Sequence, residues 1–60
     1  MPAEALLEFH QVGAIVRVTA VDPESLVEVT VQGPASAGAA VLERAAVNKL
    51  RYVLAKKQAR

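Results

Sequence analysis

The stretch Ser36–Lys57, SAGAAVLERAAVNKLRYVLAKK, decides the fold, because it has the chain's only sustained helical spacing of apolar residues. These residues recur three or four positions apart, and this spacing places them on one face of a helix. We expect Ser36 to cap the helix, since its hydroxyl can accept a hydrogen bond from a free backbone N–H. The expected core stripe consists of Ala39, Leu42, Ala46, Leu50, Val53 and Leu54.

The segments before this helix alternate apolar and polar residues with the period of two that is typical of strands. The expected strands are Ala5–Gln11, Ala14–Asp22 and Leu26–Gln32. We place one turn at Val12-Gly13 and another at Asp22–Ser25, where proline suits the second position of a type I turn.

Tight turns at these positions predict which residues pair. Phe9 would lie opposite Val16, and Val18 opposite Val29, so that one sheet face is wholly apolar. On the other face Glu8 would lie opposite Arg17, and such a pair stabilises a sheet by ~0.2–1 kcal/mol. The sequence therefore predicts an α+β fold of β-β-β-α type: a three-stranded antiparallel meander with one C-terminal helix packed on one face.

A length of 60 residues predicts one small domain, with residues 1–4 frayed, 5–34 in the sheet and 36–57 in the helix. Such a chain buries only about 60% of its unfolded surface. It contains no cysteine, which excludes a disulfide and a thiolate zinc site. Because small domains without such links often gain burial by oligomerising, we expect a homodimer or a higher oligomer.

A second apolar strip on the helix has no evident partner within one chain, and we take it as a candidate self-association surface. It consists of Val41, Ala45 and Tyr52. An alternative stays open, in which Tyr52 only flanks the core with its hydroxyl in water. The third strand carries no internal lysine or proline, so its edge could also continue a sheet into a second copy.

The formal net charge of +1 hides an uneven distribution. Residues 1–43 hold all six acids and one base, whereas residues 44–60 hold six bases and no acid. Such a basic segment can attract phosphate backbones or anionic lipid. Bases near a helix C-terminus also complement the helix dipole, and that structural explanation is sufficient. The candidate anion or nucleic-acid contacts are Lys49, Arg51, Lys56, Lys57 and Arg60.

No constellation of residues indicates catalysis. His10 is the only imidazole and lacks further ligands or a nucleophile. Glu8, Arg17 and Glu28 could form an acid–base site, but a solvated ion-pair stripe is the simpler interpretation. We therefore expect no enzyme activity, cofactor, metal or small-molecule substrate. No apolar run reaches the ~18 residues of a membrane span and no secretory signal is evident, so the expected location is the cytoplasm.

The chain resembles a family of short alphaproteobacterial proteins of unknown function. The similarity covers nearly the whole chain and is most specific at Gln32–Pro34 and in the helix from Leu42–Ala46 to Lys49–Leu54. It implies no activity or site. The chain is less similar to the later part of the double-stranded-RNA-binding domain, which has lysines where this sequence has Ser36, Ala37 and Gly38.

Two functions follow as hypotheses. The first is a small non-enzymatic interaction module that self-associates through the helix face, the sheet edge or both. The alternative is a nucleic-acid-associated accessory protein that uses the basic end of the helix.

Overall fold

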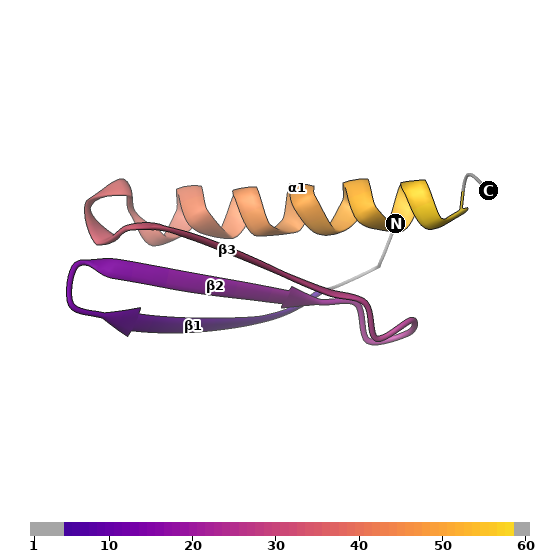
Figure 1. The fold of residues 1–60 in the computed structure, drawn as a ribbon, viewed down its shortest axis with the longest axis horizontal. Coiled ribbons are helices and arrows are strands. Elements are labelled where there is room, and N and C mark those ends of the chain that lie inside the picture. Colours follow the sequence, from indigo (N-terminus) through magenta and orange to yellow (C-terminus); the bar gives the residue numbers. More distant parts are fainter. Residues whose placement is uncertain (1–4, 59–60) are drawn as a thin grey trace.

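The computed structural model describes residues 5–58, which form three strands and two helices. Strands β1 (Leu6–Val12), β2 (Ile15–Val21) and β3 (Glu28–Pro34) form an antiparallel sheet in the order β1-β2-β3. A 3-10 helix, η1 (Ala35–Ala37), leads into α1 (Ala39–Gln58), which runs back along the sheet (Figure 1). The expected β-β-β-α meander is thus confirmed. The fraying expected for residues 1–4 lies outside the described residues.

The first hairpin turns at Gly13-Ala14, so the turn expected at Val12-Gly13 is wrong by one residue. Val12 pairs with Ile15, and Gly13 has a φ of 60°. Positive φ at the first central residue is the requirement of a type II′ turn, which suits the twist of a hairpin. As a result Phe9 lies opposite Val18 and not opposite the expected Val16.

The second connection is a wider loop than the expected turn at Asp22–Ser25. The Asp22 N–H donates to the Val27 carbonyl at 2.9 Å, and the Leu26 N–H donates to the Asp22 carbonyl at 2.8 Å. The Asp22 carboxylate organises the loop, because it accepts a hydrogen bond from the Ser25 hydroxyl at 2.7 Å. The third strand therefore begins at Glu28 and not at Leu26.

Both pairings are shifted by two residues from those expected, and the faces are nevertheless preserved. Val18 lies opposite Val31, not opposite Val29. Because side chains alternate with a period of two, a two-residue shift keeps each on its original face. The expected pair of Glu8 and Arg17 is wrong, since Glu8 lies opposite Thr19.

The start of α1 also differs from the expected one. Ser36 lies within η1 and is not the helix cap. Gly38 turns the chain with a φ of 93°, a conformation that serine rarely adopts, and its carbonyl accepts a hydrogen bond from the Leu42 N–H at 3.3 Å. The helix consequently spans Ala39–Gln58, where 36–57 was expected.

The core lies between α1 and the inner face of the sheet. Most of the expected helix stripe is confirmed as core, but Ala39 is exposed. A Cβ at Gly33 would lie 2.8 Å from Leu42 Cδ2, which shows how closely α1 begins on β3. The buried apolar residues are Val18, Ala20, Val29, Leu42, Ala46, Leu50 and Leu54.

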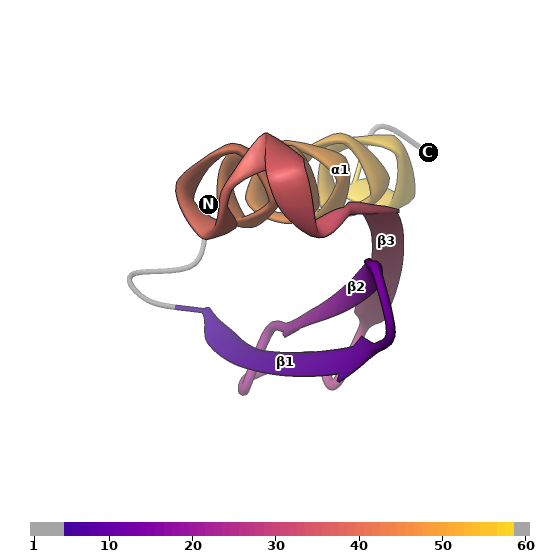
Figure 2. The same cartoon turned by 90° about the vertical axis from the view of Figure 1, so that its left-hand side faces the viewer.

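The helix covers only part of the sheet. It packs on β3 and β2, whereas β1 lies farthest from it (Figure 2). Phe9, on the inner face of β1, is 46% exposed although its neighbour Val18 is fully buried. This incomplete coverage determines which surfaces remain for interaction.

Candidate interaction surfaces

An apolar groove lies where the inner face of β1 is left bare. It has a volume of about 440 Å³ and is bordered by the sheet on one side and by the start of the helices on the other. Its lining residues are Phe9, Gln11, Val16, Ala35, Ala39 and Leu42. The sequence pattern correctly predicts the sheet face on which Phe9 lies. The expectation that one helix covers the apolar face of all three strands is wrong.

The second strip of the helix lies in solvent. Val41 is 51% exposed, Tyr52 is 64% exposed, and Ala45 is also exposed. The Lys56 ammonium lies 5.6 Å from the centre of the Tyr52 ring. A cation–π contact at an exposed site contributes about 0.5–1 kcal/mol. The strip is therefore available for contact, with a lysine at one end.

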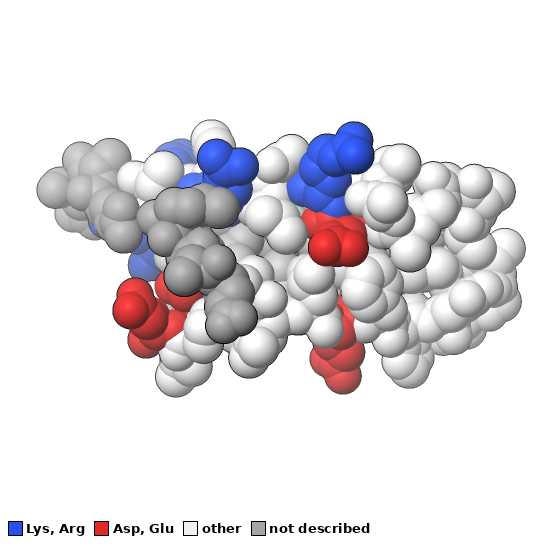
Figure 3. Space-filling view, turned by 180° about the vertical axis from the view of Figure 1, so that it is seen from behind, with Lys and Arg blue, Asp and Glu red and all other residues white. Residues whose placement is uncertain are grey.

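The structure does not bring the expected anion-binding residues together. Lys49 lies at the edge of β3, where its Nζ donates a hydrogen bond to the Thr30 carbonyl at 3.2 Å. Lys56 lies over Tyr52, Lys57 is exposed in the last turn, and Arg60 lies outside the described residues. Figure 3 shows basic side chains along the helix, one acidic side chain directly beneath one of them, and further acidic side chains at the lower edge of the molecule.

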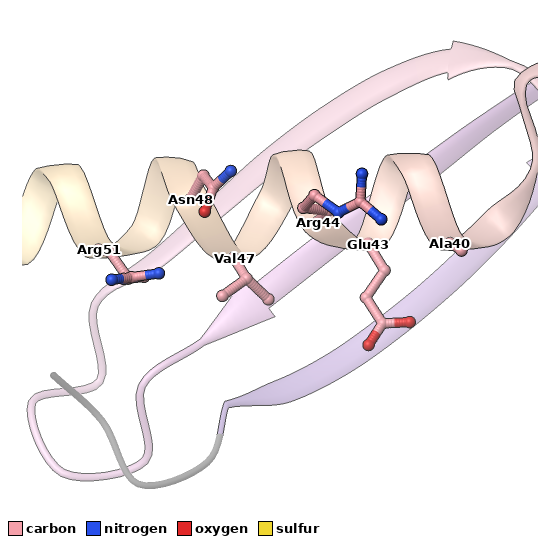
Figure 4. Close-up of a pocket in the computed structure, with 6 residues that line it drawn as sticks. All are labelled: Ala40, Glu43, Arg44, Val47, Asn48 and Arg51. Carbon is pink, nitrogen blue, oxygen red and sulfur yellow. The ribbon is translucent and has the colours of Figure 1, made fainter.

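Arg51 lines a different hollow together with Arg44. This hollow has a volume of about 410 Å³, and Glu43 contributes a carboxylate to it (Figure 4). Among residues 5–58, the residues that line this hollow all belong to α1, so the described chain forms it as a shallow concavity along one helix. A site that encloses a small molecule needs walls on several sides, and this surface provides one.

The observed pairing brings two of the residues considered for catalysis, His10 and Arg17, together beside a hollow of about 100 Å³, and it leaves Glu28 at the other end of β2. His10 lies opposite Arg17, which is a cation and cannot act as the acid that orients a catalytic imidazole. Glu28 pairs with Val21 at the far end of β2. Thr19 and Thr30 lie on the outer sheet face between these two positions, and their hydroxyls share a hydrogen bond at 3.1 Å. Within residues 5–58 no three of the possible metal-binding side chains lie close together.

Asp22 is the one buried polar residue among those described, with 6% of its surface exposed. The Ser25 hydroxyl hydrogen bond lowers the pKa of Asp22 from its ordinary value of 3.8, while desolvation opposes that effect. The backbone N–H groups of Glu24 and Ser25 contribute in the same direction, at 3.4 and 3.3 Å from the carboxylate oxygens. The Asp22 carboxylate thus has a structural role: its hydrogen bonds stabilise the loop between β2 and β3.

The helix within residues 5–58 is not apolar enough along its length to cross a membrane. A family model described as a domain of unknown function, DUF6898, matches residues 2–57. The chain belongs to this family. No curated protein and no solved structure matches it.

DUF6898 membership confirms the resemblance to a family of unknown function that spans nearly the whole chain. The alphaproteobacterial lineage of that family stays a prediction. DUF6898 brings no activity or site with it, so any function has to be argued from the surfaces described above.

Proposed function

We propose that this DUF6898 chain is a small, non-enzymatic interaction module that associates with further copies of itself. The observation that carries the proposal is the incomplete coverage of the sheet by α1. Phe9 is 46% exposed on the inner face, beside an apolar groove of about 440 Å³. Burial of apolar surface contributes roughly 25 cal/mol per Å², so covering this face would stabilise a small domain appreciably.

The apolar strip of the helix, Val41, Ala45 and Tyr52, is a second surface that supports the same proposal. Val41 and Tyr52 expose more than half of their surface. The chain buries few side chains. It has two apolar surfaces that a second copy could cover: this helix strip and the bare inner face of β1. The buried side chains of α1 and the sheet form a single cluster that includes two alanines, which fill little volume.

The non-enzymatic part of the proposal rests on the placement of the polar residues. The only histidine faces Arg17, and Asp22 is engaged by Ser25 in a structural loop. General acid–base catalysis needs a titratable group held within reach of a reacting atom in a protected site. The groove beside Phe9 is apolar and the hollow along α1 is open to solvent, so neither holds a titratable group in such a protected site.

Light scattering coupled to size-exclusion chromatography, over a dilution series, tests the proposal. We expect a molar mass above that of one chain at high micromolar concentration, falling on dilution. Phe9→Ser and the double variant V41S/Y52S would show which surface is used. Leu26→Ser is the matched control, because Leu26 is 74% exposed but lies in the loop outside both surfaces. A constant single-chain mass at all concentrations would refute self-association.

A nucleic-acid-associated role is the second candidate, and the six bases without an acid in residues 44–60 are the feature that favours it. Phosphate binding by these bases would weaken steeply with added salt. We expect K56A/K57A/R60A to abolish any binding to duplex RNA or DNA seen at low salt. Absence of any shift with wild-type protein at low salt would remove this candidate. The hydrogen bond of Lys49 to Thr30 reduces the number of free cations.

A further inference from the structure

We propose that two copies of the chain pair antiparallel through their β1 strands, centred on Phe9, to form one continuous sheet with three strands from each copy. This inference rests on the proposed self-association and names the surface and register that it uses. It follows from three observations: which sheet edge is blocked, where the backbone groups of β1 point, and which side chains would meet.

The two edges of the sheet differ. On the β3 edge, the Lys49 side chain from α1 occupies the Thr30 carbonyl at 3.2 Å, and Pro34 ends the strand without an N–H to donate. Strand β1 has seven residues, Leu6–Val12, and contains neither lysine nor proline. Lysine and proline are the residues that natural sheets use to prevent edge-to-edge pairing. Within residues 5–58, the β1 edge is therefore the one open to a second strand.

The hydrogen bond from Lys49 also shows in which direction the backbone N–H and C=O groups of each strand point. Along an antiparallel strand, residues whose N–H and C=O face one neighbour alternate with residues whose groups face the other side. Thr30 directs its carbonyl away from β2, so its partner Thr19 directs its groups to β1, where they meet Glu8. The residues of β1 that present N–H and C=O at the free edge are consequently Leu7, Phe9 and Gln11.

A two-fold axis through Phe9 makes the strand complementary to itself. Glu8 then lies opposite His10 of the partner subunit, and this contact occurs twice. Leu6 lies opposite Val12 of the partner subunit, and these side chains are 59% and 66% exposed in the single chain. An imidazole N–H can donate a hydrogen bond to the Glu8 carboxylate, and apolar cross-strand pairs are favourable. All seven residues of β1 find a partner in this register.

The neighbouring registers that keep the same backbone groups paired are poorer. A shift towards the N-terminus places the axis at Glu8 and sets two carboxylates opposite each other, which is destabilising. A shift towards the C-terminus places the axis at His10 and leaves Glu8 opposite Val12 of the partner subunit. The Phe9-centred register alone pairs each carboxylate with an imidazole.

Pairing through β1 also covers the bare inner face. Phe9 lies on that face beside the groove formed with Val16 and Leu42. A two-fold axis perpendicular to the sheet places both helices on the same side, with the two Phe9 rings adjacent between them. Aromatic cross-strand pairs are among the more stabilising. The surface that α1 leaves open in one chain would thus be closed by the second.

The decisive variants change charge within β1. H10E would place a carboxylate opposite Glu8 of the partner subunit, while inside the chain it would face Arg17, so the fold itself is not disfavoured. We expect H10E to weaken dimerisation by at least about tenfold. The double variant E8K/H10E places a lysine opposite a glutamate across the two-fold axis, and we expect it to recover most of the wild-type affinity. Circular dichroism would verify that each variant is folded.

E24K is the matched control, since it makes the same glutamate-to-lysine change in the loop outside β1, and we expect wild-type affinity. If wild type stays a single chain, the proposed function itself fails. If wild type associates but H10E associates equally well, pairing through β1 is overturned while self-association stands. If the V41S/Y52S variant is a single chain while the H10E variant still associates like wild type, pairing through β1 is overturned, and the helix strip of Val41, Ala45 and Tyr52 is the contact surface.

Discussion

At the scale of single residues, the loop between β2 and β3 holds an unusual backbone conformation. Leu26 has a φ of 65°, the only positive value at a residue other than glycine among those described. Its side chain is 74% exposed and so gains little from burial. A non-glycine residue in the left-handed region costs roughly 1–2 kcal/mol. The loop tolerates this cost because the Asp22 carboxylate fixes its other end.

Replacement of Leu26 by glycine should therefore stabilise the protein. We expect L26G to raise the free energy of unfolding by about 0.5–1 kcal/mol, because the relief of strain exceeds the greater backbone entropy of glycine. Urea unfolding followed by circular dichroism measures the difference. L26A removes the same exposed side chain but keeps the strain, so equal stability of L26A and L26G would contradict the prediction.

Asp22 makes the stability depend on acid pH. Because its folded-state pKa is lowered from 3.8, its contribution is present above that value and is lost as pH falls through the folded pKa. We expect S25A, which removes the largest cause of the shift, to lower the melting temperature near neutral pH and to reduce the acid-dependent loss. Thermal melts from neutral to strongly acid pH test this. An identical pH profile for wild type and S25A would show that the hydroxyl has no such role.

Leu50 is the largest fully buried side chain, and it lies at the centre of the helix stripe. We expect L50A to cost roughly 2–5 kcal/mol. A core of this size supplies little more than about 3–5 kcal/mol in total, so L50A should be largely unfolded at room temperature. Far-ultraviolet circular dichroism at low protein concentration measures this. V41A is the control at an exposed helix position, and similar melting of V41A and L50A would contradict the assigned core.

At the scale of elements, the sequence predicted which faces are apolar better than it predicted where the elements end. Both strand pairings were displaced by two residues, yet Leu7, Phe9 and Val18 kept their faces because the period of a strand is two. The ends depend on backbone conformations that composition does not specify. Leu26 at positive φ and Gly38 as the start of the helix are two examples.

The candidate surfaces were predictable to different degrees. The exposed strip at Val41 and Tyr52 followed from helical spacing alone. The bare face of β1 and the blocked edge of β3 did not, because they depend on where α1 crosses the twisted sheet. The hydrogen bond between Lys49 and Thr30 joins residues 19 positions apart, and no local pattern in the sequence indicates it.

Lys49 provides a prediction at this scale. K49A should expose the β3 edge as a second pairing site, so that closed dimers give way to larger assemblies of open-ended length. K57A is the matched control, because it removes the same charge from the last turn of the same helix. Light scattering across a concentration series measures the assembly size. If K49A and K57A have equal molar masses, Lys49 does not protect the edge.

At the scale of the whole molecule, one helix and a twisted three-stranded sheet do not cover each other completely. The described chain has a small core over β2 and β3 and leaves the inner face of β1 beside a groove. A second copy paired through β1 would complete the sheet and cover Phe9. The incomplete coverage of the sheet in one chain is therefore the physical reason for the proposed self-association.

Amide hydrogen exchange at low and at high protein concentration tests this central claim most directly. Amides that form hydrogen bonds between two copies should exchange more slowly as dimers form. We predict that the N–H groups of Leu7, Phe9 and Gln11 become protected at high concentration, while those of Glu24 and Ser25 in the loop between β2 and β3 exchange equally at both. Exchange rates of Leu7, Phe9 and Gln11 that do not change with concentration would contradict the account.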